Sequence, residues 1–176
     1  MTVVLLISGS TRAASTNSAA LRTVSAIAPD GVETRWYDGL AELPAFNPDD
    51  DGSTHSSVLA LREQLSRADA VLWCTPEYAG TLPGSLKNLL DWTVGTGDLY
   101  RKPVSWITVA PAGRGDGATA TLRSVLGFVG ADVDPDGVGE FVAAPACGPD
   151  HSVANNSVNS TIVATFVQGP AGTAPT

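Results

Sequence analysis

The feature of this sequence that most restricts its fold is a repeated change of hydrophobic period along the chain. Short apolar runs alternate with segments in which apolar residues recur every three or four positions. This alternation is typical of a parallel sheet covered on both faces by helices. We therefore predict an α/β domain with a doubly wound, five-stranded parallel sheet and helices on both faces. The predicted strands are Val3–Ile7, Val32–Tyr37, Ala70–Cys74, Val104–Val109 and Val138–Val142.

The intervening segments predict four helices, because each carries apolar residues on one helical face. These faces are Leu21, Val24, Ile27 and Ala28; Val58, Leu61, Leu65 and Ala68; Leu82, Leu86, Leu89, Leu90 and Thr93; and Leu122, Val125, Leu126 and Val129. In a doubly wound sheet, ligands bind beyond the carboxyl ends of the strands, at the point where the strand order reverses. The loops after the first, third and fourth strands, residues 8–16, 75–81 and 110–117, are therefore expected to form one site.

The length of 176 residues and the hydrophobic content of 43% fit one domain with one core. We assign residues 1–169 to this single domain and predict that residues 170–176 form a disordered tail. From residue 143 onward, Asp150 is the only formally charged residue, and residues that disfavour helices are frequent. Apolar residues at helical spacing between 158 and 167 nevertheless predict a last helix there.

The formal net charge of −8, from 18 acidic and 10 basic residues, restricts the possible partners. Such a charge repels nucleic-acid backbones and anionic lipid surfaces unless basic residues cluster locally, and the sequence has no such cluster. The apolar run at residues 3–7 lacks a basic flank and is too short for a signal peptide or a membrane span. We therefore expect a cytoplasmic protein that binds neither nucleic acid nor membranes.

The loop after the first predicted strand is rich in hydroxyl and amide groups. It reads SGSTRAASTN at residues 8–17 and leads directly into a helix. Unpaired backbone N–H groups and the positive end of the helix dipole favour phosphate binding there, and Arg12 adds a formal positive charge. The loop matches neither GxxxxGK[ST] nor GxGxxG. The alternative is that Ser15 or Asn17 only caps the helix.

The segment after the third predicted strand carries the second motif. It reads TPEYAGTLPGSLKNLLDW at residues 75–92. Together with the first loop, it resembles the NADPH-dependent FMN reductase family, which has a GSxRxxSxN-like loop after the first strand and a PEYNxSxPGxLKNAIDW-like segment after the third. Both motifs occur in the same order here, and together they are far more specific than either alone. The resemblance covers roughly residues 1–140.

The resemblance implies a flavodoxin-like fold, a bound FMN and the positions that hold it. Ser10, Arg12, Ser15, Thr16 and Asn17 match the positions that bind the FMN phosphate, and Pro76, Glu77, Tyr78 and Ala79 match the loop around the flavin ring, which Gly113 borders. Because the flavin itself accepts and returns the hydride, we expect no catalytic side chain. We also assign no metal.

The resemblance further implies an oxidoreductase that uses NADPH or NADH as co-substrate. The nicotinamide and a small acceptor would use one open pocket in turn, in a ping-pong order. The acceptors to which the family points are quinones, azo compounds, free flavin and metal oxyanions. Family members commonly form dimers with the flavin near the interface, so we expect a homodimer or a homotetramer.

One departure from the family pattern concerns the flavin loop. Ala79 stands where the family usually has Asn, which removes a possible hydrogen bond to FMN worth about 0.5 to 1.5 kcal/mol.

Two other functions stay open: a flavodoxin-type electron carrier, and a flavin-free interaction protein derived from a reductase. Arg12 and the helix start at 83–88 favour the reductase, because both match its motifs.

Overall fold

The computed structural model describes residues 1–110, 114–133 and 139–140. The elements in chain order are β1 (Thr2–Ser8), α1 (Thr16–Ala26), β2 (Val32–Tyr37), the 3-10 helix η1 (Gly39–Glu42), α2 (Ser56–Ser66), β3 (Ala70–Cys74), α3 (Gly84–Trp92), β4 (Pro103–Thr108), α4 (Asp116–Phe128), β5 (Asp132–Val133) and β6 (Gly139–Glu140). The four predicted helices are confirmed. The predicted last helix and the predicted tail lie outside the described residues.

The strands form a parallel sheet in the order β2-β1-β3-β4-β5, with β6 also paired to β4. β1 lies between β2 and β3, so Leu6 pairs with Trp36 on one side and with Leu72 on the other. The chain moves outward in opposite directions on either side of β1, and this reversal is the switch point at which ligands bind in such sheets. The prediction of a doubly wound parallel sheet is therefore confirmed.

The predicted last strand, Val138–Val142, contains β6, and the structure adds β5, which was not predicted. Two short strands pair with β4: Val133 of β5 pairs with Val104, and Gly139 of β6 pairs with Ile107. Between these two pairs, β4 advances by three residues, from Val104 to Ile107. The edge segment advances by six, from Val133 to Gly139.

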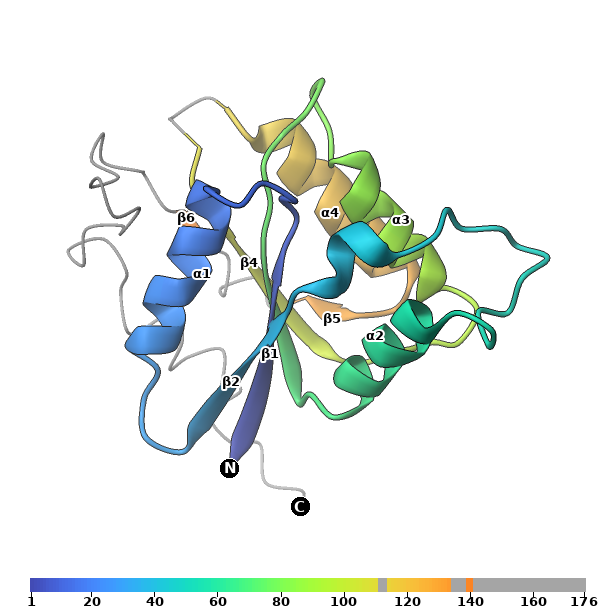
Figure 1. Cartoon of the computed structure of the whole chain (residues 1–176). Coiled ribbons are helices and arrows are strands. Elements are labelled where there is room, and N and C mark those ends of the chain that lie inside the picture. Colours follow the sequence, from blue (N-terminus) through green and yellow to red (C-terminus); the bar gives the residue numbers. More distant parts are fainter. Residues whose placement is uncertain (111–113, 134–138, 141–176) are drawn as a thin grey trace, which may run out of the picture.

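Helices cover both faces of the sheet, as Figure 1 shows, with α1 on one face and α2, α3 and α4 on the other. Successive residues of a strand point to opposite faces, and β1 shows this alternation. Val4 and Leu6 pack in the cluster with α1, whereas Leu5 and Ile7 pack with the other three helices. Trp73 and Trp106 are buried in that second cluster.

Trp92, at the end of α3, contacts the segment that follows η1. Its side chain is 1% exposed, its ring meets Phe46 edge to face at 5.1 Å, and its Nε1 donates to the carbonyl oxygen of Pro44 at 2.9 Å. Asn88, one turn earlier, also donates to Pro44 and accepts from the backbone N–H of Phe46. These contacts attach the segment around Pro44 and Phe46 to α3.

Among the described helices, none is long and apolar enough to span a membrane.

Candidate functional site

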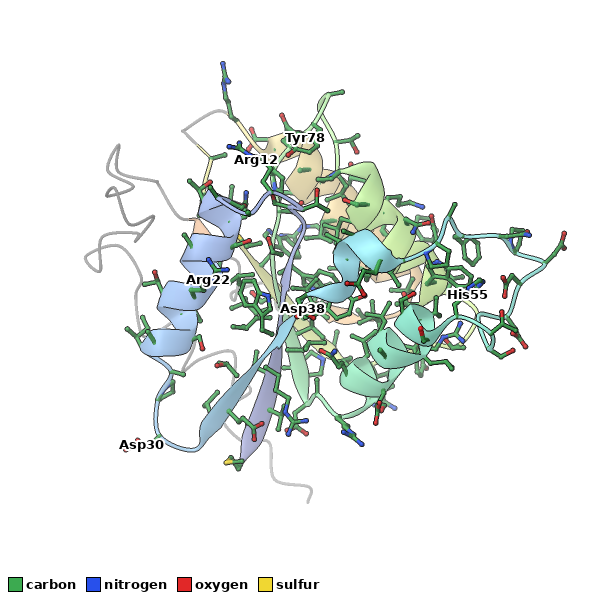
Figure 2. All side chains as sticks on the ribbon, in the orientation of Figure 1. Arg12, Arg22, Asp30, Asp38, His55 and Tyr78 are labelled. Carbon is green, nitrogen blue, oxygen red and sulfur yellow. The ribbon has the colours of Figure 1, made fainter. Side chains whose placement is uncertain are left out.

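The loops after β1 and β3 touch at the carboxyl edge of the sheet. The backbone N–H of Gly9 donates to the carbonyl oxygen of Cys74 at 2.8 Å. A Cβ atom at Gly9 would lie 2.3 Å from Thr75 Oγ1, so a side chain there would push the loops apart. Figure 2 shows Arg12 and Tyr78 at this same end of the molecule. The structure thus brings together the two sequence motifs that lie more than sixty residues apart in the chain.

The start of α1 is held by buried side chains. Ser15 is the N-cap, and its Oγ accepts from the backbone N–H of Ser18 at 3.4 Å. Asn17 is 6% exposed, and its Oδ1 accepts from the thiol of Cys74, whose pKa is raised by burial. The capping alternative therefore describes the side chain of Ser15. Ser15 and Asn17 can offer an external anion their backbone N–H groups but not their buried side chains, and Thr16 between them is exposed.

Two other predicted residues line a cavity beside this loop. Ser10 and Arg12 contribute to a space of about 240 Å³ that lies between the loop, α1 and the end of β2. Ser18 and Arg22 of α1 line the same cavity. The hydroxyl of Ser18 donates to Ser8 Oγ at 2.9 Å, which also accepts from the backbone N–H of Ser10 at 3.3 Å. The cavity therefore combines hydroxyl-bearing side chains and two arginines with one acidic residue, Asp38. Its hydroxyl and guanidinium groups are the donors that a phosphate would use.

Sequence reasoning missed Arg22. Its guanidinium carbon lies 5.4 Å from the ring centroid of Trp36 on β2, and Figure 2 shows Arg22 between α1 and the sheet. A second space of about 400 Å³, also lined by Arg22 and Trp36, continues along α1 and β2. The spacing from Ser18 to Arg22 could have revealed it, because residues four apart lie on the same helix face.

The loop after β3 ends in a tight two-residue turn. The backbone N–H groups of Tyr78 and Thr81 donate to each other's carbonyl oxygens at 2.9 and 3.1 Å. The two central residues have positive φ, 51° at Ala79 and 76° at Gly80, as a type I′ turn requires. Tyr78 is 51% exposed and projects from this turn. A type I′ turn prefers Asn-Gly, so the Asn usual in the family has a backbone reason at position 79, besides any contact with a ligand.

The side chain of Glu77 binds the start of α4. Its Oε2 accepts from the backbone N–H groups of Gly117 at 2.8 Å and Ala118 at 3.1 Å. Pro76, next to it, is half-buried. One carboxylate oxygen of Glu77 is therefore engaged by α4. Gly113, the remaining predicted residue, lies outside the described residues.

The chemistry available in these loops is that of binding. Their described residues offer backbone N–H groups, hydroxyl groups, two guanidinium groups and an exposed tyrosine. The described part of the chain holds no group of three or more His, Cys, Asp or Glu side chains that could bind a metal ion. The arrangement can hold an anionic group beside α1, with the exposed turn of the loop after β3 at the same edge of the sheet.

Comparison with known proteins gives consistent matches. A family model described as NADPH-dependent FMN reductase matches residues 1–143. An NAD(P)H-dependent FMN reductase of Pseudomonas aeruginosa is 39% identical over 137 residues, which cover 75% of this chain and 72% of that protein. A quinone reductase of Escherichia coli K12 is 36% identical over 136 residues, 74% of this chain and 72% of that protein. FerB, a flavoenzyme NAD(P)H:acceptor oxidoreductase from Paracoccus denitrificans, superposes with a TM-score of 0.80 at 28% identity over 96% of each chain.

Proposed function

The chain belongs to the NADPH-dependent FMN reductase family and is an FMN-dependent NAD(P)H oxidoreductase, and we propose that its electron acceptor is a small molecule of the quinone or azo class. One observation carries the placement of its site: the loop SGSTRAASTN and the loop TPEYAGT meet at the switch point of the sheet, through the contact of Gly9 with Cys74 and Thr75. The similarity to a quinone reductase supports this acceptor class.

The phosphate of FMN fits the loop at the start of α1. Ser10 and Arg12 would bind it with their side chains, and Ser15, Thr16 and Asn17 with backbone groups at the helix start, where the helix dipole favours an anion. Arg22 would supply a second guanidinium from the same cavity. At about 240 Å³ the cavity is smaller than a typical pocket for a whole ligand, so it would take only the phosphate end.

The flavin ring fits the loop after β3. Pro76, Glu77, Tyr78 and Ala79 would contact it largely through backbone groups, with Gly113 at the border of the site. FMN, when bound, supplies the hydride chemistry, while the protein supplies binding and orientation. The exposed turn around Ala79 leaves the outer side of this loop open to solvent. The reduced nicotinamide and the acceptor would therefore occupy one open site in turn, in the ping-pong order expected from the sequence.

We propose a cytoplasmic homodimer or homotetramer that uses NADPH or NADH and has no nucleic-acid or membrane partner. The formal net charge of −8 supports the last point, because it opposes polyanionic surfaces.

The test is a titration of the flavin-free protein with FMN, followed by anaerobic addition of NADPH and then of a water-soluble benzoquinone. We expect FMN to bind at micromolar concentration or below, its visible absorbance to be lost with NADPH, and the absorbance to return with the quinone. A protein that binds FMN but is not reduced by NADPH or NADH without a partner reductase would be an electron carrier instead. A protein that cannot bind added FMN would be neither, and the proposed function would fail.

A further inference from the structure

Helix α4 begins without a capping side chain of its own. Its N-cap position is Gly115, with φ of +93°, and the N-cap makes no side-chain hydrogen bond. An N-cap side chain normally accepts from the N–H groups two and three positions into the helix, which here belong to Gly117 and Ala118. Left without an acceptor in a half-buried helix start, these donors would destabilise α4.

Glu77 satisfies both of these donors from a different loop. Its Oε2 lies 2.8 Å from the N–H nitrogen of Gly117 and 3.1 Å from that of Ala118, across forty residues of sequence. A carboxylate is also favoured at this end of a helix by the helix dipole. Resting on the function proposed above, we propose that Glu77 is a positioning residue: by capping α4 from a distance, it fixes the loop 75–81 in the conformation that receives the flavin ring.

Further contacts show that the loop and the helix fit as one unit. The hydroxyl groups of Thr81 and Thr121 lie 2.9 Å apart, and Thr121 Oγ1 donates to the carbonyl oxygen of Gly117. A Cβ atom at Gly117 would lie 2.0 Å from the carbonyl oxygen of Gly80, so the turn and the helix approach as closely as a glycine allows. The cap is therefore the polar centre of a packed contact, and its loss would release the turn.

The functional consequence follows from the entropy of ligand binding. A loop that is already ordered loses little freedom when a ligand binds, whereas a released loop must be ordered at the expense of affinity. Because loop 75–81 contacts the ring and the loop at 8–17 contacts the phosphate, loss of the cap should weaken FMN and riboflavin by the same factor. A substitution that acted only on the phosphate site would lower the affinity for FMN and leave that for riboflavin unchanged.

The experiment compares Glu77→Ala, Glu77→Gln and the control Glu63→Ala. Glu63 is an exposed glutamate on α2 that pairs with Arg67 of the same helix. We expect Glu77→Ala to weaken FMN and riboflavin alike by about tenfold, a factor that corresponds to a typical capping interaction. Glu77→Gln keeps an acceptor oxygen at the same distance and should stay within about threefold of wild type. Glu63→Ala should leave both affinities unchanged.

A readout independent of the flavin is hydrogen exchange. In flavin-free protein, the amides of Gly117 and Ala118 should exchange faster in Glu77→Ala than in wild type or Glu63→Ala. If Glu77→Ala fails to fold, Glu77→Asp takes its place, because its carboxylate is one methylene too short to reach both donors. The same parallel loss of FMN and riboflavin is then expected.

Three results would overturn the proposal. The first is Glu77→Ala, or Glu77→Asp in its place, binding both flavins within twofold of wild type; the second is loss of FMN affinity without loss of riboflavin affinity. The third is a Glu77→Gln variant as weak as Glu77→Ala, which would show that charge and not capping matters. If wild type itself binds no FMN, the function proposed above fails, and the exchange of the Gly117 and Ala118 amides still decides whether Glu77 caps α4.

Discussion

Ala79 lies in a backbone region that L-amino acids with a Cβ rarely occupy, with φ of 51°. From the sequence alone, its departure from the usual Asn indicated a lost hydrogen bond to the flavin. The structure adds a second cost, because Ala is less suited than Asn or Gly to the first central position of a type I′ turn. The two explanations make different predictions for glycine, which has the conformational freedom but no amide.

We expect both Ala79→Gly and Ala79→Asn to relieve the turn. Each should raise the free energy of unfolding of the flavin-free protein by about 0.5 to 1 kcal/mol, measured by urea denaturation. FMN affinity, measured by isothermal titration, should improve or stay unchanged in both variants. If only the Asn variant tightens FMN and neither gains stability, the amide contact is the cause. A marked loss of affinity in the Asn variant would show that this loop is arranged differently from that of the family.

Arg12 is the cation that the sequence assigned to the phosphate. Replacing it by Ala should weaken FMN by about tenfold, the lower end of the range for a charge-assisted hydrogen bond, because Arg22 lines the same cavity and remains. Riboflavin, which lacks the phosphate, should respond by less than twofold. Arg67→Ala, which removes an exposed guanidinium on α2, is the matched control. Equal losses of both ligands in Arg12→Ala would remove Arg12 from the phosphate site.

At the scale of elements, the site depends on how closely two loops approach. Gly9→Ala places a Cβ atom 2.3 Å from Thr75 Oγ1 and 2.8 Å from Leu86 Cδ2, so the loop after β1 must move away from β3 and α3. We expect a loss of about 1 to 3 kcal/mol in the free energy of unfolding, with weaker FMN binding. The control is Gly84→Ala at the start of α3, where nothing lies within 4 Å of the added atom. An unchanged Gly9→Ala would show that the two loops tolerate separation.

The elements that the sequence predicted well are those whose signal is local. β3 is five consecutive buried residues, and the face of α3 with Leu86, Leu89 and Leu90 repeats at helical spacing, so burial alone identifies both. The sequence missed β5, because this strand is only two residues long and its register is set by pairing with β4. Short edge segments carry little periodicity of their own.

The site, too, has features that a local sequence pattern predicts and features that it does not. Motif positions in the two loops were found from their order and spacing, but the direction of each side chain was not. Glu77 turns toward α4 because the uncapped donors of Gly117 and Ala118 are there, forty residues away in the sequence. Asn17 turns inward because it accepts from Cys74. Such contacts depend on the assembled fold, which no local pattern encodes.

At the scale of the whole molecule, a ligand held by two loops that are distant in the sequence should stabilise the whole folded domain. A ligand that binds only the folded state at one hundred times its dissociation constant adds about 2.7 kcal/mol to the free energy of unfolding. For a domain of this size that corresponds to a rise in Tm of about 5 to 10 °C, measured by differential scanning calorimetry. Riboflavin at the same multiple of its own dissociation constant should give the same rise. A Tm that does not depend on FMN concentration would contradict folded-state binding.

The burial of Cys74 has a consequence for the proposed use of a quinone as electron acceptor. Quinones are electrophiles that arylate cysteine residues, and they react with the thiolate form. Cys74 lies beside the start of α1, close to the proposed site, yet its side chain is 0% exposed and burial raises its pKa, so at neutral pH it carries its proton. Its S–H donates to Asn17, which keeps the sulfur facing the protein interior. The fold thus keeps this nucleophilic sulfur beside the proposed site protonated and buried, so we expect a quinone acceptor to leave Cys74 unmodified during turnover.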